Sequence, residues 1–216
     1  MQRQVRIVVP FKLKGAKSRL ASVLTPEERR LLAFAMLKDV LDAIFDLGKV
    51  TILSRSGLKK EDLGRDVDIL ESDLELNDAL NALIEEQAGQ GWQFDIFIVM
   101  ADLALLNKDV VNGILDAEGD VVLCPGRGGG TNMILIRSPK FRTCYQGLSY
   151  PKHLAYAHDL GLNAAFFDSF RAGCDIDEPE DLAEVLLHGP GETKSVLESM
   201  GFILSDKGRK CLDRRA

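Results

Sequence analysis

The sequence has no run of about 18 or more consecutive apolar residues, which is the length that a membrane-spanning helix needs. The first four residues, Met1 to Gln4, lead directly into an apolar segment, so the pattern of a signal peptide is missing as well. We therefore expect a cytoplasmic protein that does not associate with a membrane.

Cysteine and histidine are scarce and scattered. The four cysteines include no Cys-x-x-Cys pair, and the three histidines show no ligand spacing: Cys124, Cys144, Cys174, Cys211, His153, His158 and His188. A zinc site and a disulfide framework both require closer or patterned spacing. We expect neither.

Positive charge is also in deficit, with 27 basic against 33 acidic residues, a net charge of -6 and a pI near 5.2. This balance argues against a nucleic-acid-binding protein that relies on a broad basic surface. With 216 residues, of which 46% are hydrophobic, the chain can build one substantial core. We expect a single domain over 1–216, with its core at about 5–187 and a C-terminal helix and tail at 190–216.

Apolar strand patterns alternate with helix patterns along the chain. The segment Thr25-Pro26-Glu27-Glu28 is a capping box that predicts the start of a long helix. Either Asn77 or Asp78 is expected to cap the next helix, and Asn107 the one after it, which runs to about Ala117. Expected strands lie near 7–10, 50–53, 66–70, 96–100, 121–124, 133–136 and 164–168. This alternation predicts an α/β protein: a single-domain, Rossmann-like, mostly parallel sheet flanked by helices.

A loop with four cations follows the first strand. Pro10 and Gly15 mark its turns, and its polar side chains are Lys12, Lys14, Lys17, Ser18 and Arg19. Ammonium and guanidinium groups beside a helix N-terminus can hold a polyphosphate. In an acidic chain, this local concentration of positive charge favours a specific anion, although a solvated surface loop is the alternative.

Carboxylates are expected near the same edge of the sheet. Asp102 comes directly after the buried segment 96–100, where open α/β sheets bind ligands, although it could instead cap a turn. Asp175 and Asp177 lie two residues apart, so an extended backbone would point both to one side. Separated carboxylates of this kind suit Mg²⁺, which completes its shell with phosphate oxygens and water.

A glycine-rich run at 126–130 precedes Thr131 and Asn132. Such a run lets the backbone approach a ligand closely, and a flexible hairpin is the alternative. Together, cations for a triphosphate and carboxylates for a divalent cation are the parts that nucleotidyl transfer needs. That chemistry is mostly positioning and charge neutralisation, so it requires no histidine or cysteine nucleophile.

Four motifs, in order, resemble those of the 2-phospho-L-lactate guanylyltransferases of deazaflavin coenzyme biosynthesis, which are relatives of the molybdenum-cofactor guanylyltransferases within the nucleotide-diphospho-sugar transferase fold. They are IVVPFKLKGAKSRL, VMADL, GGGTN and DIDEPEDL, and the resemblance runs from about Val5 to Leu187. It implies transfer of GMP from GTP to 2-phospho-L-lactate, with Mg²⁺ as cofactor, small-molecule partners only, and a homodimer as a possible assembly.

The resemblance also implies roles for individual residues. Lys17, Arg19 and Asp102 would be catalytic, and Asp102 with Asp175 or Asp177 would hold the metal. Substrate binding would fall to Pro10, Lys12, Lys17, Ser18, Arg19, Asn77, Gly130, Thr131 and Ser149, the last two at the three-carbon acid. Asn77 could equally be a helix cap, and Thr131 an ordinary strand residue.

Three alternatives stay open on the sequence alone. The base could differ from guanine, or the acceptor could be phosphoenolpyruvate or molybdopterin instead of phospholactate. The chain could also be a regulatory module that binds GTP without turning it over. The carboxylates at Asp102, Asp175 and Asp177 favour the enzyme, because binding alone would tolerate their loss better.

Overall fold

The structure, a computed structural model, describes residues 4–13, 15–55, 57–205 and 211–214. Lys14, one of the four cations of the predicted basic loop, lies outside these ranges.

Within the described ranges, the main sheet has the strand order β3-β2-β1-β4-β6-β5-β7. All neighbours pair in parallel except β6, which runs antiparallel to β4 and β5. The predicted α/β class with a mostly parallel sheet is therefore confirmed. The strands are β1 (Val5–Phe11), β2 (Lys49–Ser54), β3 (Asp68–Glu71), β4 (Asp95–Val99), β5 (Val121–Pro125), β6 (Thr131–Ile136) and β7 (Ala164–Phe166).

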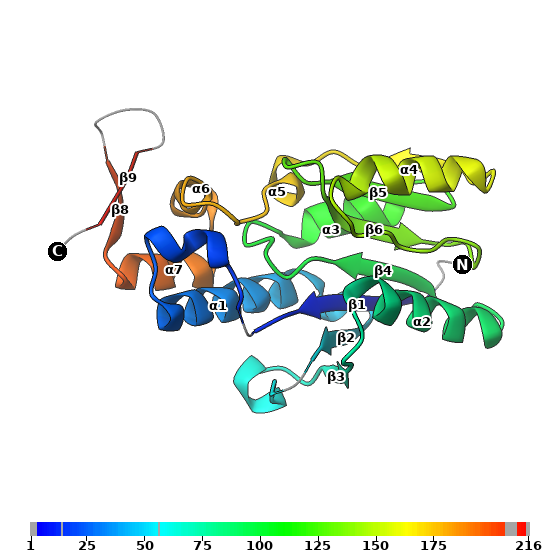
Figure 1. The fold of residues 1–216 in the computed structure, drawn as a ribbon, viewed down its shortest axis with the longest axis horizontal. Helices are drawn as coiled ribbons and strands as arrows, with labels where there is room; N and C mark the ends of the chain where they lie inside the picture. The colour runs from blue at the N-terminus through cyan, green and yellow to red at the C-terminus, as the bar shows by residue number, and fades with distance from the viewer. Residues whose placement is uncertain (1–3, 14, 56, 206–210, 215–216) are drawn as a thin grey trace.

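Helices cover both faces of this sheet (Figure 1). Helices α2 (Leu76–Gly89) and α4 (Ser149–Asp159) pack on one face, around buried residues such as Leu80 and Ala157. The other face carries the larger core cluster, with α1 (Pro26–Ile44), α3 (Lys108–Asp116), α6 (Asp181–His188) and α7 (Glu192–Ser199). The short helices are α5 (Phe170–Gly173), η1 (Ser18–Ser22), η2 (Phe45–Leu47) and η3 (Lys60–Leu63).

Local sequence explains where the longest helix begins. Thr25 accepts a hydrogen bond from the Glu28 N–H at 3.2 Å, and the Glu28 carboxylate accepts one from the Thr25 N–H at 2.8 Å. These two bonds form the predicted capping box, and Pro26 supplies the first helical residue. Helix α3 likewise begins as predicted, because Asn107 accepts from the Val110 N–H at 3.0 Å.

The second long helix corrects one prediction. Helix α2 begins at Leu76 with Glu75 at the N-cap position, so neither Asn77 nor Asp78 caps it. The Asn77 side-chain oxygen instead accepts a hydrogen bond from the Tyr145 N–H at 2.6 Å. A partner 68 residues away satisfies this amide, and local spacing could not reveal that.

The C-terminal segment also differs from expectation. A helix follows Gly191 as predicted, but the tail then continues as the antiparallel pair β8 (Phe202–Ser205) and β9 (Cys211–Arg214). These two strands lie apart from the main sheet (Figure 1). Arg214 joins them to the rest of the molecule, since its guanidinium donates to the Val23 carbonyl at 3.1 Å and pairs with Glu28.

The segments that carry the predicted functional residues lie at one edge of the main sheet. The carboxyl ends of β1 and β4 lie there, followed by the basic loop and by Asp102. Because β6 is antiparallel, its first residues lie at the same edge, and the Met100 N–H donates to the Asn132 carbonyl at 3.0 Å. Ligands of open α/β sheets bind at this edge.

Candidate active site

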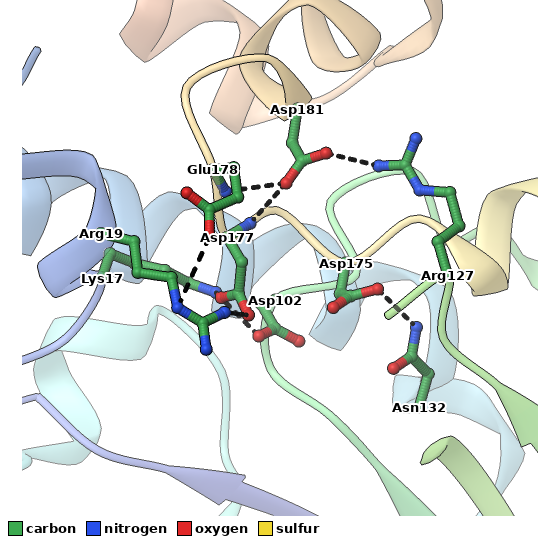
Figure 2. A network of polar contacts seen from close by, with 9 residues as sticks. All are labelled: Lys17, Arg19, Asp102, Arg127, Asn132, Asp175, Asp177, Glu178 and Asp181. Atoms are coloured by element: carbon green, nitrogen blue, oxygen red, sulfur yellow. Dashed lines mark hydrogen bonds and ion pairs between the residues drawn. The ribbon is translucent and has the colours of Figure 1, made fainter. Parts of the chain in front are cut away.

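Lysine 17 lies at the centre of the site. Its Nζ donates to Asp102 Oδ2 at 2.7 Å and to Asp177 Oδ1 at 2.8 Å (Figure 2). The three residues come from the loop after β1, the loop after β4 and the segment between α5 and α6. Their meeting joins positions 85 and 160 residues apart in the sequence.

The backbone of Lys17 is left-handed, with φ 53° and ψ 44°, at the N-cap of η1. A non-glycine residue in this region carries a strain of roughly 1 kcal/mol. The strained turn directs the side chain inward, where it is only 10% exposed. Strain of this kind persists where the surrounding contacts hold it, and here two carboxylates do so.

The charge balance around Lys17 favours the ammonium form. Burial acts most strongly and lowers the lysine pKa, but the attraction of Asp102 and Asp177 outweighs it, and the net pKa is raised above its ordinary value. The ammonium carries three N–H donors, of which the two carboxylates take two. One donor is left for a further acceptor.

Arginine 19 extends this network toward solvent. Its guanidinium contacts Asp177 Oδ2 at 3.1 Å and Glu178 Oε1 at 3.5 Å, and its side chain is 65% exposed. Lys12 and Ser18, two further members of the predicted basic loop, are exposed. The basic loop thus meets the acidic segment directly, a pairing that the sequence analysis did not foresee.

Aspartate 181 holds the acidic segment in place. Its Oδ2 accepts from the N–H groups of Asp177 and Glu178, at 2.9 and 2.8 Å, and its Oδ1 accepts from Arg127 at 2.6 Å (Figure 2). Arg127 belongs to the glycine-rich run. Its ion pair with Asp181 therefore connects the glycine-rich run to the turn that carries Asp177.

Asparagine 132 performs a similar task for Asp175. Its amide donates to Asp175 Oδ1 at 3.2 Å and to the Ala172 carbonyl at 2.9 Å (Figure 2). Burial is the largest influence on Asp175 and raises the pKa of its carboxyl, with the negative charges of Asp102 and Asp177 adding to the rise. A third carboxylate therefore lies near the other two, and no cation among the described residues pairs with it.

We tested whether this acidic cluster (Asp102, Asp175 and Asp177) fits a divalent cation. In the described part of the chain, no group of three His, Cys, Asp or Glu side chains is arranged as a metal site. The Lys17 ammonium bridges two of the three carboxylates. However, the Oδ1 atom of Asp102 is buried and accepts no hydrogen bond from the described residues. Asp102 therefore offers a carboxylate oxygen for a ligand, and burial disfavours the charged form of the nearby Asp175. This arrangement fits Mg²⁺, which binds through one or two carboxylates.

A cleft with a volume of about 260 Å³ opens at the carboxyl ends of β1 and β2. Its lining includes Pro10 near the end of β1, Lys12 just after this strand, and Met100, two residues before Asp102. Leucine side chains make much of the wall, and Arg55 and Glu75, which form an ion pair, also line it. We call it the β1–β2 cleft. Asn77 is not among its lining residues.

The glycine-rich run is ordered by its own backbone. The Gly126 N–H donates to the Gly130 carbonyl at 3.0 Å, and the Gly129 N–H donates to the Gly126 carbonyl at the same distance. A Cβ on Gly126 would lie 2.5 Å from the Asn132 side-chain oxygen, so only glycine fits. The run is a packed turn that leads into β6.

Two predicted residues at the far side of this turn also meet. Thr131 Oγ1 lies 3.1 Å from Ser149 Oγ, and both side chains are buried. The same threonine oxygen lies 2.9 Å from His153 Nδ1. We call Thr131 and Ser149 the hydroxyl pair. Its link to His153 was not predicted, because an isolated histidine on a helix gives no sequence signal.

The structure thus unites Lys17, Arg19, Asp102 and Asp177 in direct contact, and places Asp175 beside them through Asn132. Arg127 and Asp181 were not among the predicted site residues. Asp181 lies within the DIDEPEDL motif and could have been singled out as a cap of the acidic turn. Arg127 gave no such signal, since glycine-rich loops often carry exposed cations.

Comparison with known proteins identifies relatives of the whole chain. Residues 5–215 match the family model described as guanylyl transferase CofC like. A 2-phospho-L-lactate guanylyltransferase of Methanothrix thermoacetophila is 52% identical over 99% of this chain and 98% of its own length. The one from Archaeoglobus fulgidus is 39% identical, with 98% of each chain covered.

Solved structures with low sequence identity share the fold. A protein described as a nucleotide-diphospho-sugar transferase from Desulfovibrio desulfuricans G20 aligns with a TM-score of 0.74 at 15% identity, covering 91% of this chain and 95% of the other. A nucleotidyl transferase from Methanothermobacter thermautotroptrophicus gives 0.58 at 16% identity, with 91% and 99% covered. No helix in the described ranges is long and apolar enough to cross a membrane.

Proposed function

The chain belongs to the family of CofC-like guanylyl transferases, and on that premise we propose that it joins GMP from GTP to 2-phospho-L-lactate. The products are lactyl-diphosphoguanosine and pyrophosphate, in the biosynthesis of a deazaflavin coenzyme. The observation that carries the proposal is the ammonium of Lys17, held between Asp102 and Asp177 at the ligand-binding edge of the sheet.

Lysine 17 and Arg19 act on the triphosphate. A phosphate oxygen of the acceptor attacks the α-phosphorus of GTP, the bond to the bridging oxygen breaks, and pyrophosphate leaves with that electron pair. The third N–H of the Lys17 ammonium, which no carboxylate takes, donates to a phosphate oxygen. Because both carboxylates hold the ammonium in place, its charge needs no reorganisation during the reaction.

The acidic cluster would hold Mg²⁺. Asp102 contributes the Oδ1 atom that accepts no hydrogen bond, and Asp175 or Asp177 supplies a second carboxylate oxygen. When bound, the cation neutralises negative charge on the phosphate oxygens around the reacting phosphorus. Asn132 orients Asp175 for this task, and Asp181 orients the backbone of Asp177.

The β1–β2 cleft would take the guanine base. The Arg55–Glu75 ion pair at its border places a carboxylate acceptor beside guanidinium donors. Guanine presents N–H donors at N1 and N2 beside the O6 acceptor, so this pair complements its edge, whereas adenine presents the opposite pattern. Apolar walls such as Leu53 and Met100 would cover the ring faces.

The acceptor would bind at the hydroxyl pair, Thr131 and Ser149, with Gly130 just before it. Hydroxyl donors suit the anionic oxygens of a small phosphorylated acid. Thr131 begins β6 directly before Asn132, whose amide contacts Asp175. Because the two backbone positions are adjacent, the acceptor site would lie near the acidic cluster, as in-line attack requires.

An assay of pyrophosphate release tests the function. GTP, ATP, CTP and UTP are each paired with 2-phospho-L-lactate, phosphoenolpyruvate and phosphoglycerate, with Mg²⁺ present. We expect the highest kcat/KM for GTP with 2-phospho-L-lactate. Higher kcat/KM with phosphoenolpyruvate would reassign the acceptor, and GTP binding without pyrophosphate release from any pair would indicate a regulatory module.

Two lysine variants provide the matched control. Lys17→Ala removes the central ammonium and should lower kcat/KM by at least 100-fold. Lys60→Ala removes a surface cation that pairs with Asp66 and belongs to none of the site contacts described above. This variant should leave kcat/KM unchanged. Equal activity of the two variants would remove Lys17 from the catalytic centre.

A further inference from the structure

Histidine 153 connects the hydroxyl pair to a backbone N–H through an unbroken chain of hydrogen bonds. The Cys144 N–H donates to His153 Nε2 at 2.7 Å, His153 Nδ1 lies 2.9 Å from Thr131 Oγ1, and that oxygen lies 3.1 Å from Ser149 Oγ. The imidazole is 0% exposed, and the two hydroxyl residues are 3% exposed. The hydrogen bonds within this chain are therefore shielded from bulk water.

The direction of every proton in this chain follows from its first link. A backbone N–H can only donate, so Nε2 must offer its lone pair and carry no proton. Burial lowers the pKa of His153 to about 4, so the ring is neutral at physiological pH. A neutral ring with a bare Nε2 has its proton on Nδ1, and that proton points to Thr131.

The remaining links follow by the same reasoning. Thr131 Oγ1 accepts the Nδ1 proton, so its own proton goes to Ser149 Oγ, the second atom within hydrogen-bond distance. Ser149 then receives a hydrogen bond, and its own proton is the one that the chain does not use. The chain ends in a hydroxyl donor at the first residue of α4.

We propose that His153 is a positioning residue that fixes the direction of this chain, so that Ser149 presents its proton to an anionic oxygen of the acceptor. This inference rests on the proposed function. Without the Nδ1 donor, the Thr131 and Ser149 protons could reverse, and the serine would then donate to the threonine instead of to the substrate. His153 thus acts on acceptor affinity from behind the hydroxyl pair, without touching the substrate.

The surroundings of the ring hold it in this orientation. Phe141 lies 5.9 Å from the imidazole centroid and Tyr145 lies 5.0 Å away, edge to face. Asn77 also fixes the Tyr145 backbone from the first turn of α2, and the nearby residues Glu75 and Leu76 line the β1–β2 cleft. The Asn77 bond therefore anchors the loop that carries the Cys144 N–H.

The test measures acceptor KM, GTP KM and kcat for His153→Phe, which keeps a ring but removes both nitrogens. We expect acceptor KM to rise roughly 3- to 10-fold, with GTP KM within about twofold of wild type. His153→Gln keeps one acceptor and one donor and should recover much of the loss. A Gln variant no better than the Phe variant would mean that ring packing matters instead of hydrogen bonding, and would overturn the proposal.

A double-mutant cycle separates positioning from general structural damage. Ser149→Ala removes the terminal donor and should raise acceptor KM about 10-fold or more. Once Ser149 is gone, adding His153→Phe should change acceptor KM by less than about twofold, because the imidazole acts through that hydroxyl. Additive effects would overturn the proposal. His158→Gln, an exposed histidine on the same helix, is the matched control and should match wild type.

Two inhibitors identify the substrate group that Ser149 contacts. L-Lactate carries the carboxylate of the acceptor without its phosphate, and inorganic phosphate represents the phosphate group without the carboxylate. His153→Phe should raise the inhibition constant of one of them and leave the other unchanged; no change in either would contradict the proposal. If the wild type releases no pyrophosphate from GTP with phospholactate, the proposed function fails instead, and the two failures stay distinct.

Discussion

Replacing Lys17 with methionine would leave two carboxylates facing the space where a shared cation had been. Asp102 and Asp177 each lose a hydrogen bond of less than 3 Å to the ammonium, at 2.7 and 2.8 Å, and their negative charges then repel each other. Methionine has nearly the same length and keeps the apolar packing of the lysine stem. The variant therefore reports the charge more than the shape.

The expected loss in stability follows from the burial of the three side chains. Removing one partner of a fully buried ion pair costs about 3–5 kcal/mol. Here Lys17 is 10% exposed, but Asp102 and Asp177 are 27% and 36% exposed, so water screens part of the repulsion. We expect Lys17→Met to lower the free energy of unfolding by about 1–3 kcal/mol, which corresponds to roughly 3–10 °C in Tm.

Magnesium should reverse this effect if the acidic cluster binds it. A ligand at ten times its Kd adds about 1.4 kcal/mol to the folded state. Chemical denaturation of Lys17→Met with and without millimolar Mg²⁺ measures that gain without any substrate. The control is Lys60→Met, whose exposed pair with Asp66 should contribute at most about 1 kcal/mol and show no such response. Equal stability of the two variants would refute the reasoning, and a Mg²⁺-insensitive Lys17→Met would refute the metal assignment.

Three further predictions concern single carboxylates. Burial raises the pKa of Asp175, so the contribution of this side chain to stability is full below its unfolded pKa and is lost as the pH rises through the folded pKa. Asp175→Asn should therefore stabilise the protein at pH 7 by roughly 0.5–2 kcal/mol, measured by denaturant titration. Below about pH 4 the substitution should give no gain. Asp39 accepts from the N–H groups of Glu192 and Thr193 at 2.6 and 2.9 Å, so Asp39→Ala should lower the free energy of unfolding by about 1–3 kcal/mol while kcat stays unchanged. Glu75→Gln replaces one of the acceptors proposed for guanine. The ratio of kcat/KM for GTP to kcat/KM for ATP should therefore fall at least 10-fold. An unchanged ratio would show that Glu75 does not recognise the base.

Features set by neighbouring residues could be predicted from the sequence. The capping box of Thr25 and Glu28 and the Asn107 cap need only three residues of context, and both form as predicted. The alternation of strands and helices predicted the mostly parallel sheet. Asp102 was singled out because it follows a buried strand, and the edge of the sheet brings it to Lys17.

Features that depend on distant partners could not be predicted. The basic loop was interpreted as a site that awaits an anion, whereas Lys17 and Arg19 already contact carboxylates, because a segment about 160 residues away folds back onto them. Asn77 was interpreted as a possible cap or nucleotide contact, but a loop N–H occupies its oxygen. His153 gave no signal, since only the tertiary fold places Thr131 and the Cys144 N–H on its two nitrogens.

Transfer of radioactive label from the α-phosphate of GTP is the most direct measurement of the proposed reaction. With 2-phospho-L-lactate as acceptor, we expect label in the acid-linked product for wild type. We expect at least a 100-fold lower rate for Asp102→Asn, whose circular dichroism and Tm should stay close to wild type. Wild-type rates in Asp102→Asn, or an acid-linked product that carries no label, would contradict the proposed guanylyl transfer.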